Sequence, residues 1–386
     1  MSIKSDLHKL KMLIFFFHVT NTIIISFLPL YLNFKGLSGT EIGWVLAIGP
    51  LASIISQPFW GFLSDKYKTV KWILIMTIIG MLIFSILFFQ MNQLIFILIF
   101  GAMFYFFSSP VGALGDSLAQ RQADLLNISF GSIRTWGSIG FALSSLFIGQ
   151  LLNIFGVEFM RWPYLIFGTV LLVIAFQISD VKTTDHQSVN FNDLKTLFSN
   201  KQFVSFLIIM MFITITHRAN DSFIGLFITS LGGSESLVGI GWFIALVSEA
   251  FIFAFAYKWF KKDRALFFII LASILYTMRW ILFAVSKDPL IILSGQILHG
   301  LTFGIFYLSS LDYISNLIPN RLKSSGHLIF YSVFFGLSGI IGSIGGGLIF
   351  DHLSGNHLYF SLSLLSLIGT FLLLLYHIKY QSKNSA

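Results

Sequence analysis

The sequence predicts an all-α polytopic membrane protein with twelve transmembrane helices in two six-helix halves. Hydrophobic residues make up 56% of the 386 residues and charged residues only 10%, and the mean hydropathy is +0.86. These values lie outside the range of soluble globular proteins. Apolar runs of about 20 residues, long enough to cross a hydrocarbon core about 30 Å thick, recur along the whole chain. One long polar segment divides these runs into two equal groups.

Each expected span begins and ends where an apolar run meets polar or charged residues. The first span follows the basic segment MSIKSDLHKLKM and has no small-residue cleavage site after it. We therefore expect a retained helix and not a removed signal peptide. In chain order, the expected spans are 10–33, 40–62, 70–90, 93–119, 130–155, 160–179, 202–230, 237–258, 265–286, 289–317, 323–350 and 356–378.

The placement of the basic residues predicts the orientation of the chain. Of the 24 Lys and Arg residues, eighteen fall on the side that holds both termini, whereas only Lys35, Arg161 and Lys287 fall on the other side. Cytoplasmic loops carry the excess of Lys and Arg in membrane proteins. We therefore expect a multi-pass protein of the cell membrane with both termini in the cytoplasm. The net charge of +8 then reflects topology, and nucleic-acid binding is not expected.

The long polar segment DVKTTDHQSVNFNDLKTLFSNK falls between the sixth and seventh spans. The expected domains are an N-terminal six-helix half over 1–180, a cytoplasmic central loop over 181–201 and a C-terminal six-helix half over 202–386. Two parallel six-helix halves are typical of one large class of transporters.

An internal repeat supports the division into halves. The tripeptide Ile-Gly-Trp at 42–44 precedes an acid–base pair at 65–66 by the same interval that separates 240–242 from 263–264. Glycines also form a helical stripe in the eleventh span, at Gly336, Gly339, Gly342 and Gly345. Such a stripe indicates either close packing of two helices or a surface on which the halves slide.

Between the second and third spans lies the segment PFWGFLSDKYKTVK. It resembles the loop signature of the major facilitator superfamily, in which a glycine is followed four residues later by an acid, then by a base and by further basic residues. The matching positions are Gly61, Asp65, Lys66 and Lys71, while Thr69 and Val70 depart from the pattern. The chain is thereby identified as a member of this superfamily, and the resemblance implies the major facilitator fold.

The resemblance also implies a cytoplasmic gate built from Gly61, Asp65 and Lys66. The Asp65 carboxylate would face the positive end of a helix in the other half, because helix N-termini attract negative charge. The expected acceptor is the start of the eleventh span, near Ser324 and Ser325.

Ionisable residues inside apolar spans are costly, so their presence is informative. They are Asp116, Arg134, Arg218, Asp221, Glu249 and Arg279, with Asp312 near one end of a span and with His18, His217 and His299 as companions. Asp116 and Arg134 are expected to meet across a short turn, and Asp221 shares a helix face with Arg218. Such residues either form structural ion pairs or line a water-filled cavity. The cavity is favoured because both halves hold more of them than packing needs.

The stretch from Gly112 to Phe141 resembles the fourth and fifth helices of the lactose permease family. In that family an acid and an arginine at this separation bind the substrate, which implies this role for Asp116 and Arg134. Phe141 stands where the family has a tryptophan that stacks on the sugar. This departure favours a planar or apolar substrate.

The second half continues the resemblance to the lactose permeases. The implied proton-coupling set is Glu249, Arg279 and His299, with Asp221 as a further candidate. The family carries an acid three residues after this histidine, where this chain has Thr302. It carries a lysine three residues before the histidine, where this chain has Gln296. The run LHGLTFG is instead similar to the phenylpropionate-permease branch, although Ser132 replaces the usual arginine of that branch.

Gln296, His299 and Thr302 recur at three-residue spacing, so they stay on one broad helix face and are expected to line the cavity. Gln296 is therefore a candidate substrate ligand, as are His18 and Asn21 in the first span. The alternative for all of these residues is a set of interhelical hydrogen bonds that hold the bundle together.

Other classes of protein lack their motifs in this sequence. There is no P-loop, H-E-x-x-H or G-x-S-x-G, and ALGD at 113–116 lacks the first glycine of the intramembrane aspartyl proteases. We therefore expect no enzyme, no catalytic residue, no ATP-driven pump and no cofactor. The chain has no cysteine, which removes thiolate metal sites, and no metal site is expected.

The sequence thus predicts a secondary active transporter that takes up a small organic solute, such as an aromatic acid, a sugar or a nucleoside, by proton symport and alternating access. Its expected partners are the substrate, protons and the lipid bilayer, and it is expected to act as a monomer. Proton-antiport efflux of drugs or metabolites is the alternative. The fifth span, GSIGFALSSLFIGQLL, lacks the Gly-Pro and Gly-Gly signature of antiporter families, which favours uptake. A receptor that does not transport is the third interpretation.

Overall fold

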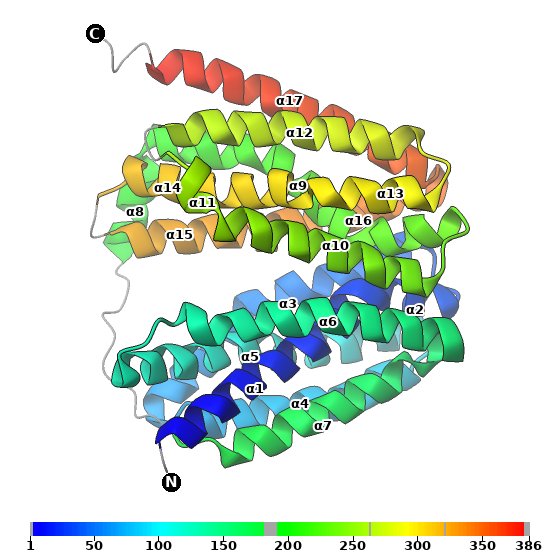
Figure 1. Ribbon diagram of the computed structural model, residues 1–386, viewed down its shortest axis with the longest axis vertical. Helices are drawn as coiled ribbons and strands as arrows, with labels where there is room; N and C mark the ends of the chain where they lie inside the picture. Colours follow the sequence, from blue (N-terminus) through cyan, green and yellow to red (C-terminus); the bar gives the residue numbers. More distant parts are fainter. Residues whose placement is uncertain (1–2, 181–190, 262–263, 320–321, 382–386) are drawn as a thin grey trace. The chain divides into compact units, whose positions relative to one another are not determined.

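The structure, a computed structural model, describes residues 3–180, 191–261, 264–319 and 322–381 (Figure 1). Across these ranges the regular structure is helical, without a strand. Twelve of the described helices are long and apolar enough to cross a membrane. The predicted all-α, twelve-span class is therefore confirmed.

The chain divides into two compact units. The first comprises Met1–His186 and Ser234–Phe243, and the second comprises Gln187–Gly233 and Ile244–Ala386. The helix α10 (Glu235–Ala254) therefore contributes to both units. The division predicted from the sequence places the whole of this helix in the second half, and the predicted halves stay a prediction.

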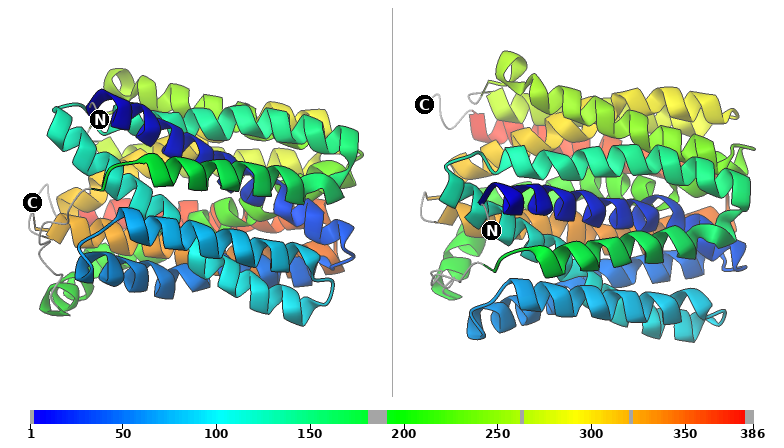
Figure 2. Two further views of the ribbon diagram at one scale, coloured as in Figure 1. Left: turned by 90° about the horizontal axis from the view of Figure 1, so that it is seen from below. Right: turned by 60° about the horizontal axis from the view of Figure 1, so that its bottom comes forward.

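The first unit holds the first six spans. Its elements are α1 (Ile3–Thr22), the π-helical turn η1 (Ile23–Phe27), α2 (Leu28–Phe34), α3 (Gly39–Lys66), α4 (Lys71–Gln90), α5 (Leu94–Leu126), α6 (Gly131–Phe155), the 3-10 turn η2 (Val157–Met160) and α7 (Arg161–Gln177). Within this unit α1 lies along α6 and α7, and α5 lies along α3 and α4 (Figures 1 and 2).

Helix ends in the first unit are set by local polar contacts. α3 begins with a capping box, because the Ser38 hydroxyl accepts from the Glu41 amide and the Glu41 carboxylate accepts from the Ser38 amide. The start of α4 is capped from a distant part of the sequence. Asp180, which follows α7, accepts hydrogen bonds from the Val70 and Lys71 amides, 3.2 and 3.1 Å away. It thereby satisfies amides that the helix itself leaves unpaired.

The second unit holds most of the remaining spans. Its elements are α8 (Phe191–Ser199), α9 (Lys201–Ser230), the second part of α10, α11 (Ala256–Trp259), α12 (Ala265–Val285), α13 (Pro289–Gly295), the 3-10 turn η4 (Gln296–Leu298), the π-helical turn η5 (Gly300–Gly304), α14 (Ile305–Leu317), α15 (Lys323–Tyr331), the π-helical turn η7 (Ser332–Leu337), α16 (Ser338–His352) and α17 (Gly355–Gln381). α12 lies along α17, and α9 lies along α16 and α17.

Several predicted elements differ from the structure. The second span was expected to end at residue 62, but α3 continues to Lys66. The fourth span was expected to end at residue 119, but α5 continues to Leu126, because polar residues beyond the apolar run extend the same helix. The eighth span was expected to reach residue 258, but its helix ends at Ala254. The central loop was expected over 181–201, but α8 occupies its second part, while residues 181–190 lie outside the described ranges.

The glycine stripe of the eleventh span packs only in part. A side-chain carbon at Gly342 would lie 2.8 Å from the Ile215 carbonyl oxygen on α9, and one at Gly346 would lie 3.0 Å from the Phe223 ring. Gly336 and Gly345 face open space. The row that lets α16 approach α9 closely is therefore formed around Gly342 and Gly346.

Candidate functional site

In the first unit, α5 and α6 bring the predicted acid and arginine together. The Arg134 Nε lies 3.5 Å from the Asp116 Oδ1, and the two side chains are 39% and 38% exposed. Asp116 lies ten residues before the end of α5, and not near its end as predicted, because α5 extends further than expected. The pair is neutral as a whole, and its exposure leaves both groups accessible to a ligand.

His18 and Arg134 meet at Gly137. The His18 Nδ1 donates a hydrogen bond to the Ile14 carbonyl oxygen, 2.8 Å away on the same helix. A side-chain carbon at Gly137 would lie 2.6 Å from the Arg134 Nη1 and 2.8 Å from the His18 ring. Only glycine therefore leaves room for both groups against α6. This places His18 beside the Asp116–Arg134 pair.

Phe141 lies about two turns after Arg134 on α6 and is buried. Its ring centroid is 5.9 Å from that of Trp242 on α10, with the planes tilted by 47°. The indole nitrogen of Trp242 is buried and has no hydrogen-bond partner among the described residues. Asn21, on α1, is half-buried, and its side chain makes no hydrogen bond within the described part of the chain. The sequence prediction missed Trp242 as a site residue, although the repeat contains it.

In the second unit, Glu249, His299 and Arg279 form a line of contacts. The Glu249 Oε2 lies 3.6 Å from the His299 Nε2, and the His299 Nδ1 lies 3.5 Å from the Arg279 Nη1. Arg279 is fully buried and donates hydrogen bonds to the Gln296 amide oxygen and, over 3.2 Å, to the Thr302 hydroxyl. The 3-10 turn η4 and the π-helical turn η5 flank His299, and they supply these two partners from one short segment.

This arrangement fixes the tautomer of His299. Arginine carries only hydrogen-bond donors, so the His299 Nδ1 must accept from Arg279. The single proton of the neutral ring is then on Nε2, where it points at the Glu249 carboxylate. A second proton on Nδ1 would face the N–H groups of a cation. The Nδ1 of His299 therefore faces Arg279, and its Nε2 faces Glu249.

The predicted contact between Glu249 and Arg279 is not direct. Among the described residues no ion pair joins them, and the His299 ring lies between the two. Gln296 was predicted as a substrate ligand, and here its amide is engaged by Arg279. Its substrate role stays a prediction.

Asp221 has a different environment from Glu249. Its Oδ2 lies 2.9 Å from the Arg218 Nη1 and 3.4 Å from the His217 Nε2. The Tyr276 hydroxyl lies 3.1 Å from the His217 Nδ1. Asp221 thus has a permanent cation as partner. His217 was already singled out with the ionisable residues of the spans, whereas Tyr276 was not predicted, since a tyrosine within an apolar run is indistinguishable from a packing residue.

The two histidines of the second unit share an aromatic neighbour. The Phe303 ring stacks on His217 with centroids 4.7 Å apart and planes 8° apart, and it lies 5.5 Å from the His299 ring. The two imidazole centroids are 5.6 Å apart. The Asp221 group and the Glu249 group are therefore neighbours in one cluster.

The predicted gate residues lie at the end of α3. Gly61 is half-buried, whereas Asp65 and Lys66 are exposed, and the Asp65 carboxylate has no partner among the described residues. Thr69, which departs from the family signature, donates its hydroxyl hydrogen bond to Asp180. The threonine that replaces the family's basic residue thus helps to hold Asp180 in place as the cap of α4. Docking of Asp65 on the eleventh span stays a prediction, and the side chain of Ser324 lies outside the described residues.

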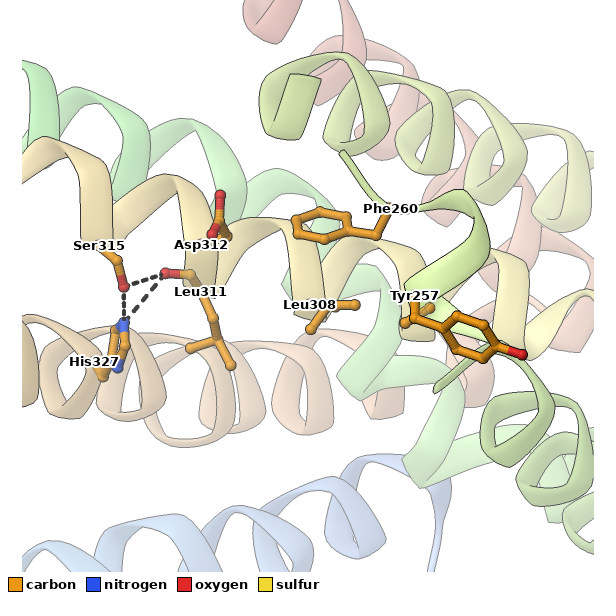
Figure 3. A pocket seen from close by; sticks show the side chains of 8 residues that line it. Tyr257, Phe260, Leu308, Leu311, Asp312, Ser315 and His327 are labelled. Carbon is orange, nitrogen blue, oxygen red and sulfur yellow. Dashed lines mark hydrogen bonds between the residues drawn. The ribbon is translucent and has the colours of Figure 1, made fainter. Parts of the chain in front are cut away.

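A separate cavity of about 490 Å³ lies in the second unit, between α11, α14 and α15 (Figure 3). Its lining combines apolar and polar groups, namely Ala256, Tyr257, Phe260, Leu308, Leu311, Asp312, Ser315 and His327. The His327 Nε2 lies 2.8 Å from the Ser315 hydroxyl and 3.2 Å from the Leu311 carbonyl oxygen. Asp312, one of the ionisable residues singled out in the sequence, lines this cavity, whereas no residue predicted for the substrate, proton coupling or the gate does. Among the described residues, no group of three or more His, Asp or Glu side chains is placed to hold a metal ion.

Residues 7–361 match the family described as "MFS_1 like family". The chain belongs to this family. The predicted membership of the major facilitator superfamily is thereby confirmed, and the chain is a permease-type transporter of this superfamily, a multi-pass membrane protein.

Two relatives and one solved structure extend this finding. The "Uncharacterized transporter YwbF" of Bacillus subtilis (strain 168) is 28% identical over 371 residues, which cover 94% of this chain and 90% of that protein. The "Probable 3-phenylpropionic acid transporter" of Escherichia coli (strain K12) is 26% identical over 365 residues, which cover 91% of this chain and 92% of that protein. The crystal structure of nucleoside transporter NupG matches with a TM-score of 0.86 at 16% identity, over 97% of this chain and 99% of that chain. It shares the fold.

Proposed function

We propose that the protein takes up a small organic solute by proton symport and alternating access, with Glu249 as the proton carrier. The observation that carries this proposal is that Glu249 lies against a histidine, at 3.6 Å, and not against an arginine. The other two candidate acids each lie against the guanidinium group of an arginine: Asp116 against Arg134, and Asp221 against Arg218.

A proton carrier must gain and lose a proton during each cycle. A permanently charged arginine beside a carboxylate favours the anion and opposes protonation. An imidazole carries no permanent charge, so the His299 ring, 3.6 Å from the Glu249 carboxylate, opposes its protonation less than a guanidinium group would. Glu249 is therefore better suited to carry the proton than Asp221.

The substrate is proposed to bind at Asp116 and Arg134, with His18, Asn21 and Phe141 beside them. The exposure of the ion pair and the room that Gly137 leaves for Arg134 and His18 support this assignment. The relative named for 3-phenylpropionic acid supports a solute with a planar ring. Aromatic acids, nucleosides and sugars are the solutes to test. We further propose that the protein is a monomer of the cell membrane. Both termini are proposed to lie in the cytoplasm, because basic residues are distributed eighteen to three in favour of that side.

The test is uptake of radiolabelled 3-phenylpropionate, uridine and maltose into proteoliposomes with an imposed pH gradient, acidic outside. The wild type should accumulate one of these probes against its concentration gradient. Glu249→Gln should keep exchange of the probe across the membrane but lose uphill accumulation. Glu235→Gln is the matched control, because it changes the same residue type at the other end of α10 and should keep accumulation.

Two results would contradict the proposal. Uphill accumulation by Glu249→Gln would exclude Glu249 as the carrier, and Asp221→Asn would be tested next. A wild type that ignores the pH gradient would exclude proton symport. Proton-antiport efflux, the alternative, predicts that an acidic lumen drives the probe into the vesicle.

A further inference from the structure

We propose that the cavity between α11, α14 and α15 binds a small organic ammonium ion, whose charged group lies at the Asp312 carboxylate and whose apolar body lies against the rings of Tyr257 and Phe260. This site goes beyond the proposed function, because it shares no residue with the groups proposed for the substrate, the proton or the gate. All of its lining residues belong to the second unit. Its volume of about 490 Å³ lies within the usual range of ligand pockets, about 300–1,000 Å³.

One wall of the cavity is formed where the eighth span breaks. α10 ends at Ala254, and the short helix α11 follows after a turn. The Trp259 indole N–H donates a hydrogen bond over 3.1 Å to the Ile252 carbonyl oxygen in the last turn of α10, where carbonyl groups lack intrahelical partners. The Trp259 ring also packs against Phe268 on α12, with centroids 5.3 Å apart. At the repeat-related position the first half has Gly61, and α3 passes through it without a break. Trp259 thus holds α11 in place as a wall of the cavity.

Most of the lining is apolar. Tyr257 and Phe260 contribute rings from one wall, and Leu308 and Leu311 contribute side chains from α14. Such a lining favours the apolar body of an organic ligand. Aromatic faces also attract a cation within about 6 Å, and the Lys258 Nζ lies 5.8 Å from the centroid of the Tyr257 ring. The lining therefore suits an organic cation better than a hydrated metal ion.

Asp312 supplies the negative charge of the site. Its Oδ2 accepts a hydrogen bond over 3.2 Å from the uncharged Asn316 amide, and no cation among the described residues lies within ion-pair distance of it. A carboxylate accepts about four hydrogen bonds, so most of its acceptor positions are open. The side chain is half-buried, and charges act more strongly where water is partly excluded. An ammonium group would supply the missing counter-charge.

His327 does not neutralise Asp312. Its Nε2 lies 2.8 Å from the Ser315 hydroxyl and 3.2 Å from the Leu311 carbonyl oxygen. The Asp312 carboxylate lies on the side of α14 that holds the Phe260 ring, whereas His327 lies on the other side (Figure 3). The lining contains no Lys or Arg, so an anionic ligand would meet the Asp312 charge without a cation to hold it.

The internal repeat explains why this acid lacks a cation. Counted from the first residue of each span, Asp312 in the tenth span and Asp116 in the fourth differ by one position. His327 on α15 and Arg134 on α6 also differ by one position. In the first unit the arginine lies 3.5 Å from the acid and balances its charge. The second unit has a histidine in place of this arginine, so its acid is free to hold a cation from outside the protein.

The position of the cavity indicates where the ligand comes from. Residues 256–260 follow the eighth span, which ends at Ala254. The proposed topology places this end of the span at the cytoplasm. The ligand is therefore a water-soluble amine that reaches the site from the cytoplasm. It would contact α11, α14 and α15 together, and a ligand that binds only the folded protein stabilises it.

The test is binding of radiolabelled 2-phenylethylammonium to the purified full-length protein, measured by scintillation proximity and by the rise in melting temperature. Neutral 2-phenylethanol is the matched ligand, because it has the same ring and chain without the charge. The wild type should bind the ammonium ion and melt at a higher temperature in its presence. The alcohol should bind about 10- to 100-fold more weakly.

Variants locate the binding site. Asp312→Asn keeps the shape of the side chain and removes its charge, so the affinity for 2-phenylethylammonium should fall about 10- to 100-fold. Asp124→Asn is the matched control and should keep the affinity, because Asp124 also accepts from an amide side chain four residues away on its own helix. Leu308→Trp fills the cavity and should abolish binding with the charge retained. Melting curves without ligand check that each variant is folded.

Three results would overturn the site. They are the absence of binding to the wild type at millimolar concentrations, an unchanged affinity in Asp312→Asn, and unchanged binding in Leu308→Trp. Loss of binding in Asp116→Asn or Glu249→Gln, with Asp312→Asn unaffected, would also overturn it, because the amine would then occupy the groups proposed for the substrate or the proton. None of these results alters the pH-driven uptake that tests the proposed function, so the two proposals fail separately.

Discussion

Alanine at Gly137 and alanine at Gly140 should have opposite effects, although the two glycines lie one turn apart on α6. A side-chain carbon at Gly137 would lie 2.6 Å from the Arg134 Nη1 and 2.8 Å from the His18 ring. At Gly140 the same carbon would lie 2.6 Å from the Phe15 carbonyl oxygen on α1. The first neighbour is the free end of a side chain, whereas the second is the backbone of a packed helix.

The magnitudes follow from what each neighbour must do. Gly140→Ala pushes α1 away from α6, and overpacking of this kind costs about 1–3 kcal/mol of unfolding free energy. Gly137→Ala displaces Arg134 from Asp116, and an ion pair this exposed contributes about 0–1 kcal/mol. The same displacement removes Arg134 from the proposed substrate position. A hydrogen bond from a charged group contributes about 1.5–3 kcal/mol, so the affinity for substrate should fall about 10- to 100-fold.

The assay combines thermal unfolding in detergent with the affinity for whichever probe the wild type binds. Gly140→Ala should lower the melting temperature and keep the affinity of the folded fraction, and Gly137→Ala should do the reverse. Gly345→Ala is the control, because its added carbon meets open space and should change neither quantity. Equal loss of stability in both α6 variants, or an unchanged affinity in Gly137→Ala, would refute the assignment of Arg134 to the substrate.

Three further predictions concern the gate, the cap of α4 and the topology. Asp65→Asn removes the charge that the proposed gate directs at a helix terminus, an interaction that contributes about 0.3–2 kcal/mol. The transport rate should therefore fall while the affinity for the probe is kept. Loss of both together would argue against a gate. Asp180→Ala removes the cap of α4 and should lower the unfolding free energy by about 0.5–2 kcal/mol. The control in the denaturation experiment is Asp124→Ala, whose carboxylate accepts a hydrogen bond from Gln120 on its own helix. An unchanged value would show that the cap contributes nothing. Alkaline phosphatase fused after Ala386 should be inactive, and an active fusion would reverse the proposed topology.

The spans could be predicted from the sequence because the bilayer sets their length and apolarity. Expected spans such as 265–286 and 289–317 agree closely with α12 (Ala265–Val285) and with the tenth span (Pro289–Leu317). The continuation of α5 to Leu126 could not be predicted in this way. Its last turns are polar, and hydropathy reports where the membrane ends and not where the helix ends.

The candidate site was predictable as a set of residues, but not as a set of pairs. Asp116 and Arg134 meet as expected, and Glu249 meets His299. The partners of Arg279 depend on the 3-10 and π-helical turns around His299, which shift side chains away from regular helical positions. Regular helical periodicity contains no signal for such turns.

The cap of α4 also constrains the order in which the protein is assembled. Asp180 lies 109 residues after Lys71, whose amide it accepts from. A ribosome adds roughly 5–20 residues each second, so the first turn of α4 is without this partner for at least several seconds after it has been synthesised. Insertion of the third span must therefore succeed with its leading amides solvated by water or by lipid headgroups. The first six spans become a closed unit only when the chain beyond the sixth has left the ribosome.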